Sequence, residues 1–139
     1  MTSISQARET VYQHWVDNVP SGLDAWTFEN EEGFREPDQD KAWARVSVRH
    51  LDGGQESLGG LLNRKFRRNA AVAVQVFTPR GGGLGAGDDL AAEILTLFEA
   101  KSISGLDFVN GNISEIPPGD DEKTFQHNIV VRFDYEEIK

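Results

Sequence analysis

The sequence predicts an α+β fold, in which a mostly antiparallel sheet has a long β-hairpin arm and two helices pack on one face. Two segments, residues 2–19 and 88–101, carry apolar residues at the three- and four-residue spacing of a helix. Two others, residues 42–51 and 125–135, alternate apolar and polar residues with the two-residue period of a strand. Glycine and proline clusters separate these segments, so each is expected to form its own element.

An amphipathic helix is expected over residues 2–19. Ser3 and Gln6 have the spacing of a capping box at its start, and a proline and a glycine follow its end. The apolar stripe of this helix consists of Ile4, Ala7, Val11, Trp15 and Val19. A short strand near residues 25–28 and an acidic loop over residues 29–40 are expected to follow.

The arm is expected to begin with a strand over residues 42–51. One face of this strand carries Ala42, Ala44, Val46 and Val48, and the other carries Trp43, Arg45, Ser47 and Arg49. Glycines within residues 53–60 mark the turn, and the chain is expected to return antiparallel through residues 61–78. Basic side chains on the distal half of the arm would prevent promiscuous edge pairing while still allowing a specific partner.

The arm also supplies the candidate subunit interface, which is expected to include a partly exposed tryptophan. The interface residues are Leu61, Leu62, Arg64, Lys65, Phe66, Arg67, Arg68 and Trp43. The candidate acidic counter-surface comprises Glu29, Glu31, Glu32, Glu36, Asp38 and Asp40. With 23 carboxylates against 14 lysines and arginines, the net charge is −9, and the separation of the two signs favours head-to-tail contact between copies. Solvated loops and an exposed strand face would give the same pattern.

The second half of the chain is expected to form a helix, a short hairpin and a final strand. Asp88 and Asp89 are expected to cap the helix and to place negative charge at its positive end. Asn110 with Gly111 is a strong signal for a type I′ turn between two short strands. The final strand alternates most clearly, with Phe125, His127, Ile129, Val131, Phe133 and Tyr135 on one face.

A nucleotide-binding enzyme that uses the Gly81–Gly87 loop is the alternative from another functional class. Gly81, Gly83 and Ala86 match the dinucleotide fingerprint between a strand and a helix. However, Asp88 and Asp89 stand where a pyrophosphate would bind, and like charges would repel it. A flexible connector explains the glycines better, so we expect no enzyme and no cofactor.

No metal site is expected from residue spacing. The three histidines, His14, His50 and His127, lack the spacing of metal ligands, and His127 is expected to be a hydrogen-bonded core residue. The acidic pair Asp88-Asp89 and the run at residues 120–122 lack the pattern of a loop that binds a hard cation. The absence of cysteine excludes a thiol nucleophile and a zinc site of the cysteine type.

The length and composition of the chain limit the classes of protein to which it can belong. The 139 residues match one domain, residues 1–139, that is large enough for its own core. The N-terminus lacks the apolar segment of a signal peptide, and no apolar run approaches the roughly 18 residues of a membrane span. A free-standing DNA-binding module would more usually be basic than acidic. We therefore expect a protein that acts away from membranes and does not bind DNA specifically.

Nearly the whole chain resembles the lambda-type tail terminator proteins of long-tailed bacteriophages, and it is most similar to the minor tail, terminator-like proteins of prophages. The matching features are Asn30, Phe34 and Pro37 ahead of Trp43-Ala-Arg-Val-Ser-Val, Gly59-Gly60, Arg67-Arg68, Val74-Gln-Val-Phe-Thr-Pro with its trailing glycines, Ile94, Phe98 and Phe133-Asp134. The order of the elements supports the resemblance more strongly than any single motif does.

The resemblance implies a structural subunit rather than an enzyme. Its members are expected to form a homohexameric ring that caps the tail tube, stops tube elongation and presents a surface for head joining. The implied partners are other copies of the chain, the tail tube protein and a head–tail connector or head-completion protein. The implied location is the head-proximal end of the virion tail, after an unassembled stage in the host cytoplasm. The alternative within the same fold is a head–tail connector or tail-completion subunit.

The charge of the chain fits such a ring. Six copies at −9 each give roughly −54, a negative field through which DNA would pass without specific binding. Salt or divalent cations are expected to help assembly by screening this repulsion.

Overall fold

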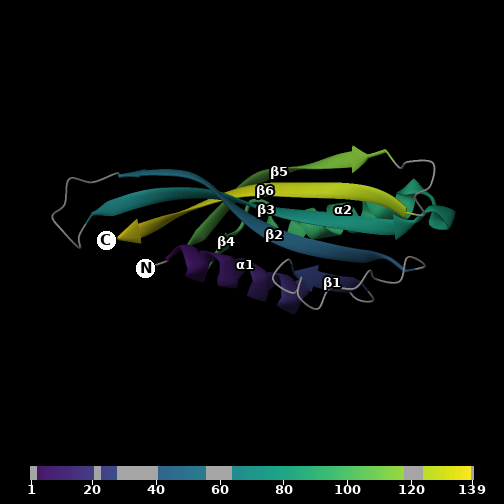
Figure 1. The fold of residues 1–139 in the computed structure, drawn as a ribbon, viewed down its shortest axis with the longest axis horizontal. Helices are drawn as coiled ribbons and strands as arrows, with labels where there is room; N and C mark the ends of the chain where they lie inside the picture. The colour runs from purple at the N-terminus through teal and green to yellow at the C-terminus, as the bar shows by residue number, and fades with distance from the viewer. Residues whose placement is uncertain (1–2, 21–22, 28–40, 56–63, 118–123, 139) are drawn as a thin grey trace.

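The computed structural model describes residues 3–20, 23–27, 41–55, 64–117 and 124–138. The described elements in chain order are α1 (Ile4–Asn18), β1 (Asp24–Thr27), β2 (Trp43–Gln55), β3 (Lys65–Pro79), the short 3-10 helix η2 (Arg80–Gly82), α2 (Leu84–Phe98), β4 (Ser102–Ile103), β5 (Leu106–Ile116) and β6 (Thr124–Ile138). The long strands run side by side as one twisted sheet, with α1 and α2 packed beside it (Figure 1). The predicted α+β class is confirmed.

The sheet has the strand order β1-β2-β3-β6-β5-β4, and every pair except the parallel pair β1–β2 is antiparallel. β3 and β6 pair over their whole length, from Lys65 opposite Ile138 to Pro79 opposite Thr124. The arm is therefore a ribbon of three strands, β2, β3 and β6, and not a hairpin of two. In Figure 1 this ribbon extends beyond both helices, toward the end of the chain marked C.

Both helices cover the same face of the sheet, because their buried residues belong to one apolar cluster. The predicted alternation holds in β6, where every second residue from His127 to Tyr135 is buried. The sheet contributes to the cluster Ala44, Val46, Val48, Ala70, Val72, Val74, Val76, Leu106, Phe108, Ile129, Val131, Phe133 and Tyr135. The helices contribute Ala7, Val11, Trp15, Ala91, Ile94 and Phe98. The apolar periodicity of the sequence thus identifies the core correctly.

The start of α1 is as predicted. The Ser3 side chain accepts a hydrogen bond from the Gln6 backbone N–H, and the Gln6 side chain accepts one from the Ser3 backbone N–H. This capping box satisfies two donors that a helix start otherwise leaves unpaired. Ile4, the first residue of the predicted stripe, is exposed, so only the later turns of α1 pack on the sheet.

The start of α2 differs from the prediction. Gly83 is the N-cap residue with φ 75°, and the helix begins at Leu84, so Asp88 and Asp89 lie in the second turn and do not cap it. Glycine at position 87 has a packing reason, because a Cβ there would lie 2.4 Å from Cε1 of His127. The glycine run is therefore not only a loop, because Gly85 and Gly87 belong to a helix that packs closely on β6.

The predicted turn at Asn110-Gly111 is wrong. Both residues lie within β5, where the register against β6 shifts between Phe108 and Gly111, as at a β-bulge. The chain reverses instead at Ser104-Gly105, the two residues between β4 and β5, with φ of 48° and 86°. Two positive φ values are the signature of a type I′ turn, so the expected turn type occurs at a different place.

Candidate subunit interface

Part of the predicted interface lies in the described residues. Arg64 lies directly before β3. The first four residues of β3, at the distal end of the arm, are Lys65, Phe66, Arg67 and Arg68. Outside the described residues lie Leu61, Leu62, Glu29, Glu31, Glu32, Glu36, Asp38 and Asp40. None of the residues from Lys65 to Asn69 is buried, whereas burial begins at Ala70. The distal arm therefore projects from the core.

One face of the distal arm carries an ionic network within the chain. Nζ of Lys65 lies 3.5 Å from Oε2 of Glu136, and Nη1 of Arg67 lies 3.6 Å from Oδ1 of Asp134. The β3–β6 register explains these contacts, since Arg67 stands directly opposite Glu136. Sequence clustering alone predicts that these cations contact another copy, whereas three carboxylates in the last six residues are the signal for these partners within the chain.

The opposite face of the arm carries a shorter and more protected ion pair. Nε and Nη2 of Arg68 both lie 3.0 Å from Oε1 of Glu137, and only 21% and 15% of the two side chains are exposed. The Arg68 guanidinium also lies 5.1 Å from the ring centroid of Phe66, within the range of a cation–π contact. Arg68 thus links β3 to β6 within the same chain.

A polar cluster lies where the arm meets the core. The rings of His50 and Tyr135 meet edge to face, with centroids 6.1 Å apart. Burial, followed by the charges of Arg8 and Arg68, lowers the pKa of His50 below 6.5. Burial, followed by the charge of Glu137, raises the pKa of Tyr135 above 10.0. Both rings are therefore held in their neutral forms at neutral pH.

The expected partial exposure of Trp43 is wrong. Trp43 stands directly opposite Phe77 in the β2–β3 register, and the two rings stack with centroids 4.1 Å apart and an interplanar angle of 12°. This cross-strand pair leaves only 7% of Trp43 exposed. Trp43 packs within the described chain and does not present an open surface.

The family model for the phage tail terminator protein matches residues 13–133. The chain belongs to the phage tail terminator family. This family is one of structural proteins, so the terminator has a structural role in a phage tail and is located in the virion tail.

A solved structure supports the same fold. It has a TM-score of 0.69 against the terminator at 16% sequence identity, and the match covers 100% of this chain and 99% of that one. At this identity the likeness establishes the fold alone. No curated protein sequence matches the terminator. Among the helices of the described residues, none has the length and apolarity needed to cross a bilayer.

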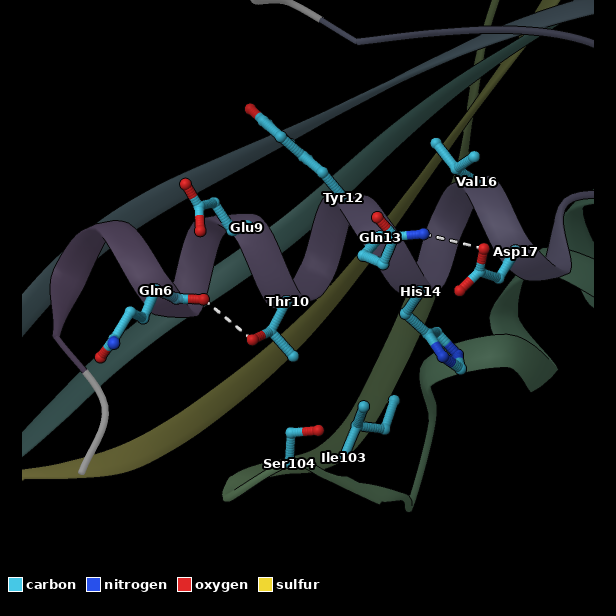
Figure 2. A pocket seen from close by; sticks show the side chains of 10 residues that line it. All are labelled: Gln6, Glu9, Thr10, Tyr12, Gln13, His14, Val16, Asp17, Ile103 and Ser104. Atoms are coloured by element: carbon cyan, nitrogen blue, oxygen red, sulfur yellow. Dashed lines mark hydrogen bonds between the residues drawn. The ribbon is translucent and has the colours of Figure 1, made fainter.

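The described surface of the terminator has a wide hollow of about 880 Å³ between α1 and the turn after β4 (Figure 2). Thr10 and His14 point toward Ile103 and Ser104, whereas Tyr12 points to the other side of the helix (Figure 2). His14 is held in place, because its Nε2 lies 2.8 Å from the carbonyl oxygen of Leu97. The hollow is shallow, and both polar and apolar side chains line it.

The glycine loop of the terminator lacks the setting of a dinucleotide site. That site requires two parallel strands joined by a helix. In the described sheet, β3 has β2 and β6 as neighbours, and both are antiparallel to it. The glycines after β3 instead form η2 and the first turns of α2.

Proposed function

We propose that this terminator assembles into a homohexameric ring that caps the tail tube, stops its elongation and presents a surface for head joining. Membership of the terminator family supports a role at the tail, and the observation that carries the ring is the three-stranded arm. Its distal part has no buried residue in β3 before Ala70, so it is partly exposed in a single copy. A neighbouring copy would cover this surface.

Two unpaired strand edges in the described sheet support contact between copies. β1 pairs with β2 along Trp43–Val46 only. Among the described strands, residues 47–55 of β2 therefore pair with β3 on one side and leave the other edge of β2 unpaired. On the far side of the sheet, β4 pairs with the first two residues of β5 and leaves residues 112–116 with β6 alone. Contact between two different edges is heterologous, and such a contact closes into a ring when the rotation between neighbouring copies divides a full turn.

The arm's charges set the conditions for assembly. Lys65, Arg67 and Arg68 are opposed by carboxylates of β6, so ring contacts through these cations would form by partner exchange or in addition to the internal pairs. With −9 per copy, repulsion between copies should weaken the ring at low salt, because screening is then least effective. We propose that the tail tube and a head–tail connector or head-completion protein bind opposite faces of this ring, and that DNA passes through its acidic lumen.

Negative-stain electron microscopy and mass photometry of the purified protein test the ring. We expect six-fold rings with a central hole, more abundant at 500 mM than at 50 mM salt because of screening. Monomers at every concentration and salt level would refute the ring. Equal populations at both salt levels would refute the electrostatic part alone. Rings that bind the head-proximal ends of tail tubes would distinguish a terminator from a connector subunit.

Charged substitutions at the two strand edges test the contact. Leu51 on β2 and Ile113 on β5 are exposed apolar residues, so Leu51→Lys and Ile113→Lys should leave the monomer folded and reduce the ring fraction. Val16→Lys is the matched control, because Val16 is an exposed apolar residue on α1 and lies on neither edge. Rings unaffected by both edge variants would exclude these edges from the interface.

A further inference from the structure

A histidine and two carboxylates from three separate elements converge near the start of α2. His127 lies on β6, Glu115 stands directly opposite it on β5, and Asp88 reaches it from α2. One ligand atom from each residue, a ring nitrogen and two carboxylate oxygens, lies within 4.8 Å of the other two. Nε2 of His127 is already 2.9 Å from Oδ1 of Asp88. The three residues are far apart in sequence, so residue spacing gave no sign of this group.

The imidazole is a fixed ligand, and the carboxylates are open to solvent. Only 1% of the His127 side chain is exposed, against 57% of the Asp88 side chain. The ring packs so closely on Gly87 that a Cβ there would lie 2.8 Å from Nδ1 and 2.4 Å from Cε1. The Glu115 side chain is exposed and forms no ion pair or side-chain hydrogen bond within the described part of the chain. An ion could enter from solvent and meet a ligand that is already oriented.

From this convergence we propose that Asp88, Glu115 and His127 bind a divalent transition-metal ion of the Zn²⁺ type. One imidazole nitrogen with two carboxylate oxygens is a ligand set that Zn²⁺ accepts, whereas Mg²⁺ and Ca²⁺ prefer oxygen ligands alone. Zinc–ligand distances of about 2.0–2.2 Å require only small side-chain movements from the present arrangement. Water would complete the coordination on the exposed side.

The surroundings of the buried ring also suit metal binding. When Nε2 binds a metal, the ring proton resides on Nδ1, which then needs an acceptor. Nδ1 of His127 and the Thr78 hydroxyl are both buried and have no hydrogen-bond partner among the described residues. They lie 2.8 and 3.1 Å from the position that a Cβ of Gly87 would occupy, so both atoms border the same small space and the hydroxyl is the nearest side-chain oxygen at that point. Binding at Nε2 would move the single ring proton to Nδ1, and the Asp88 oxygen that now faces Nε2 would turn to the ion.

Calorimetric titration of the full-length chain with ZnCl2 tests the site, with any histidine tag removed and the protein dialysed against chelator. We expect one Zn²⁺ per chain, a higher melting temperature with the ion, and no comparable effect of Mg²⁺ or Ca²⁺. Glu115→Gln should weaken Zn²⁺ binding at least tenfold and remove most of the melting shift. Its matched control is Glu93→Gln, an exposed glutamate on α2 outside the cluster, which should bind like the wild type.

Two outcomes would overturn the proposal. One is the absence of Zn²⁺ binding by the wild-type chain, and the other is equal affinity in Glu115→Gln and Glu93→Gln. His127→Gln could disturb the core, so Asp88→Asn serves as the second ligand variant, because Asp88 is exposed. Co²⁺ substitution adds a spectroscopic test, since the visible bands of Co²⁺ should change between wild type and Asp88→Asn. Oligomer size measured on the same samples keeps this result separate from the ring.

Discussion

Arg68 binds Glu137 across the β3–β6 ladder, with Nε and Nη2 both 3.0 Å from Oε1. The pair links β3 to β6 in the distal arm, and its two residues are 69 positions apart in the sequence. A segment of clustered cations would otherwise attract any acidic surface. Because its own last strand supplies carboxylates, the arm has a defined shape in a single copy. In the proposed ring, a neighbouring copy would therefore recognise that shape rather than positive charge alone.

A double-mutant cycle on Arg68→Ala and Glu137→Ala should give a coupling of roughly 1–2 kcal/mol in the free energy of unfolding. This exceeds the usual value for a fully exposed pair, because both side chains are largely shielded from water. Urea denaturation of the four variants measures the coupling. The cycle on Lys65 and Glu136, whose side chains are about twice as exposed or more, serves as the control and should give less than about 1 kcal/mol. Equal couplings in the two cycles would contradict the argument.

The ring is better tested at Arg64 than at Arg67 and Arg68. Reversing the latter two charges would set them against Asp134 and Glu137 and disturb the arm itself. Arg64 is exposed and has no ion pair with the described residues. Arg64→Glu should therefore leave the melting temperature within a few degrees and lower the ring fraction in mass photometry. Arg132→Glu is the matched control on an exposed position of β6, and an equal loss of rings in both variants would exclude a specific role for Arg64.

Short-range sequence patterns correctly predict the structural features that depend on residues close together in the chain. The capping box of Ser3 and Gln6 and the alternation of β6 were correct, because each is set by residues a few positions apart. The third strand of the arm was missed, because nothing in the periodicity of β3 says which strand lies beside it. Asp88, taken for a helix cap, instead meets His127 from the second turn, and that contact depends on the whole fold.

Two glycines should respond oppositely to alanine. In Gly111→Ala the new Cβ would lie 2.7 Å from side-chain atoms of Leu95 and Val131 and 2.8 Å from the Val130 carbonyl oxygen, so neighbours must shift. We expect a loss of about 1–3 kcal/mol in the free energy of unfolding. In Gly85→Ala the Cβ meets nothing within 4 Å, and the higher helix propensity of alanine should add about 0.5–1 kcal/mol. Urea denaturation of both variants measures these effects, and equal stability of both would contradict the close packing around Gly111.

His50 should make the terminator less stable as the solution becomes acidic. Burial and the charges of Arg8 and Arg68 lower its pKa in the folded state, while Glu137 acts weakly in the opposite sense. Below pH 6.5 the unfolded chain therefore binds this proton more readily than the folded chain does. The contribution of His50 to stability is constant above that pH and decreases as the pH falls toward the lowered pKa.

The variant His50→Gln removes this titration. Urea unfolding of wild type and variant between pH 7.5 and 5.0 should show that the wild type loses more stability on acidification. The carboxylates are the same in both proteins, so their titration cancels in the difference. His14→Gln controls for the loss of a histidine elsewhere, because His14 lies on α1 against Phe98, away from the arm. Equal changes in stability with pH for wild type and His50→Gln would show that burial and the nearby positive charges do not lower the pKa of His50 in solution.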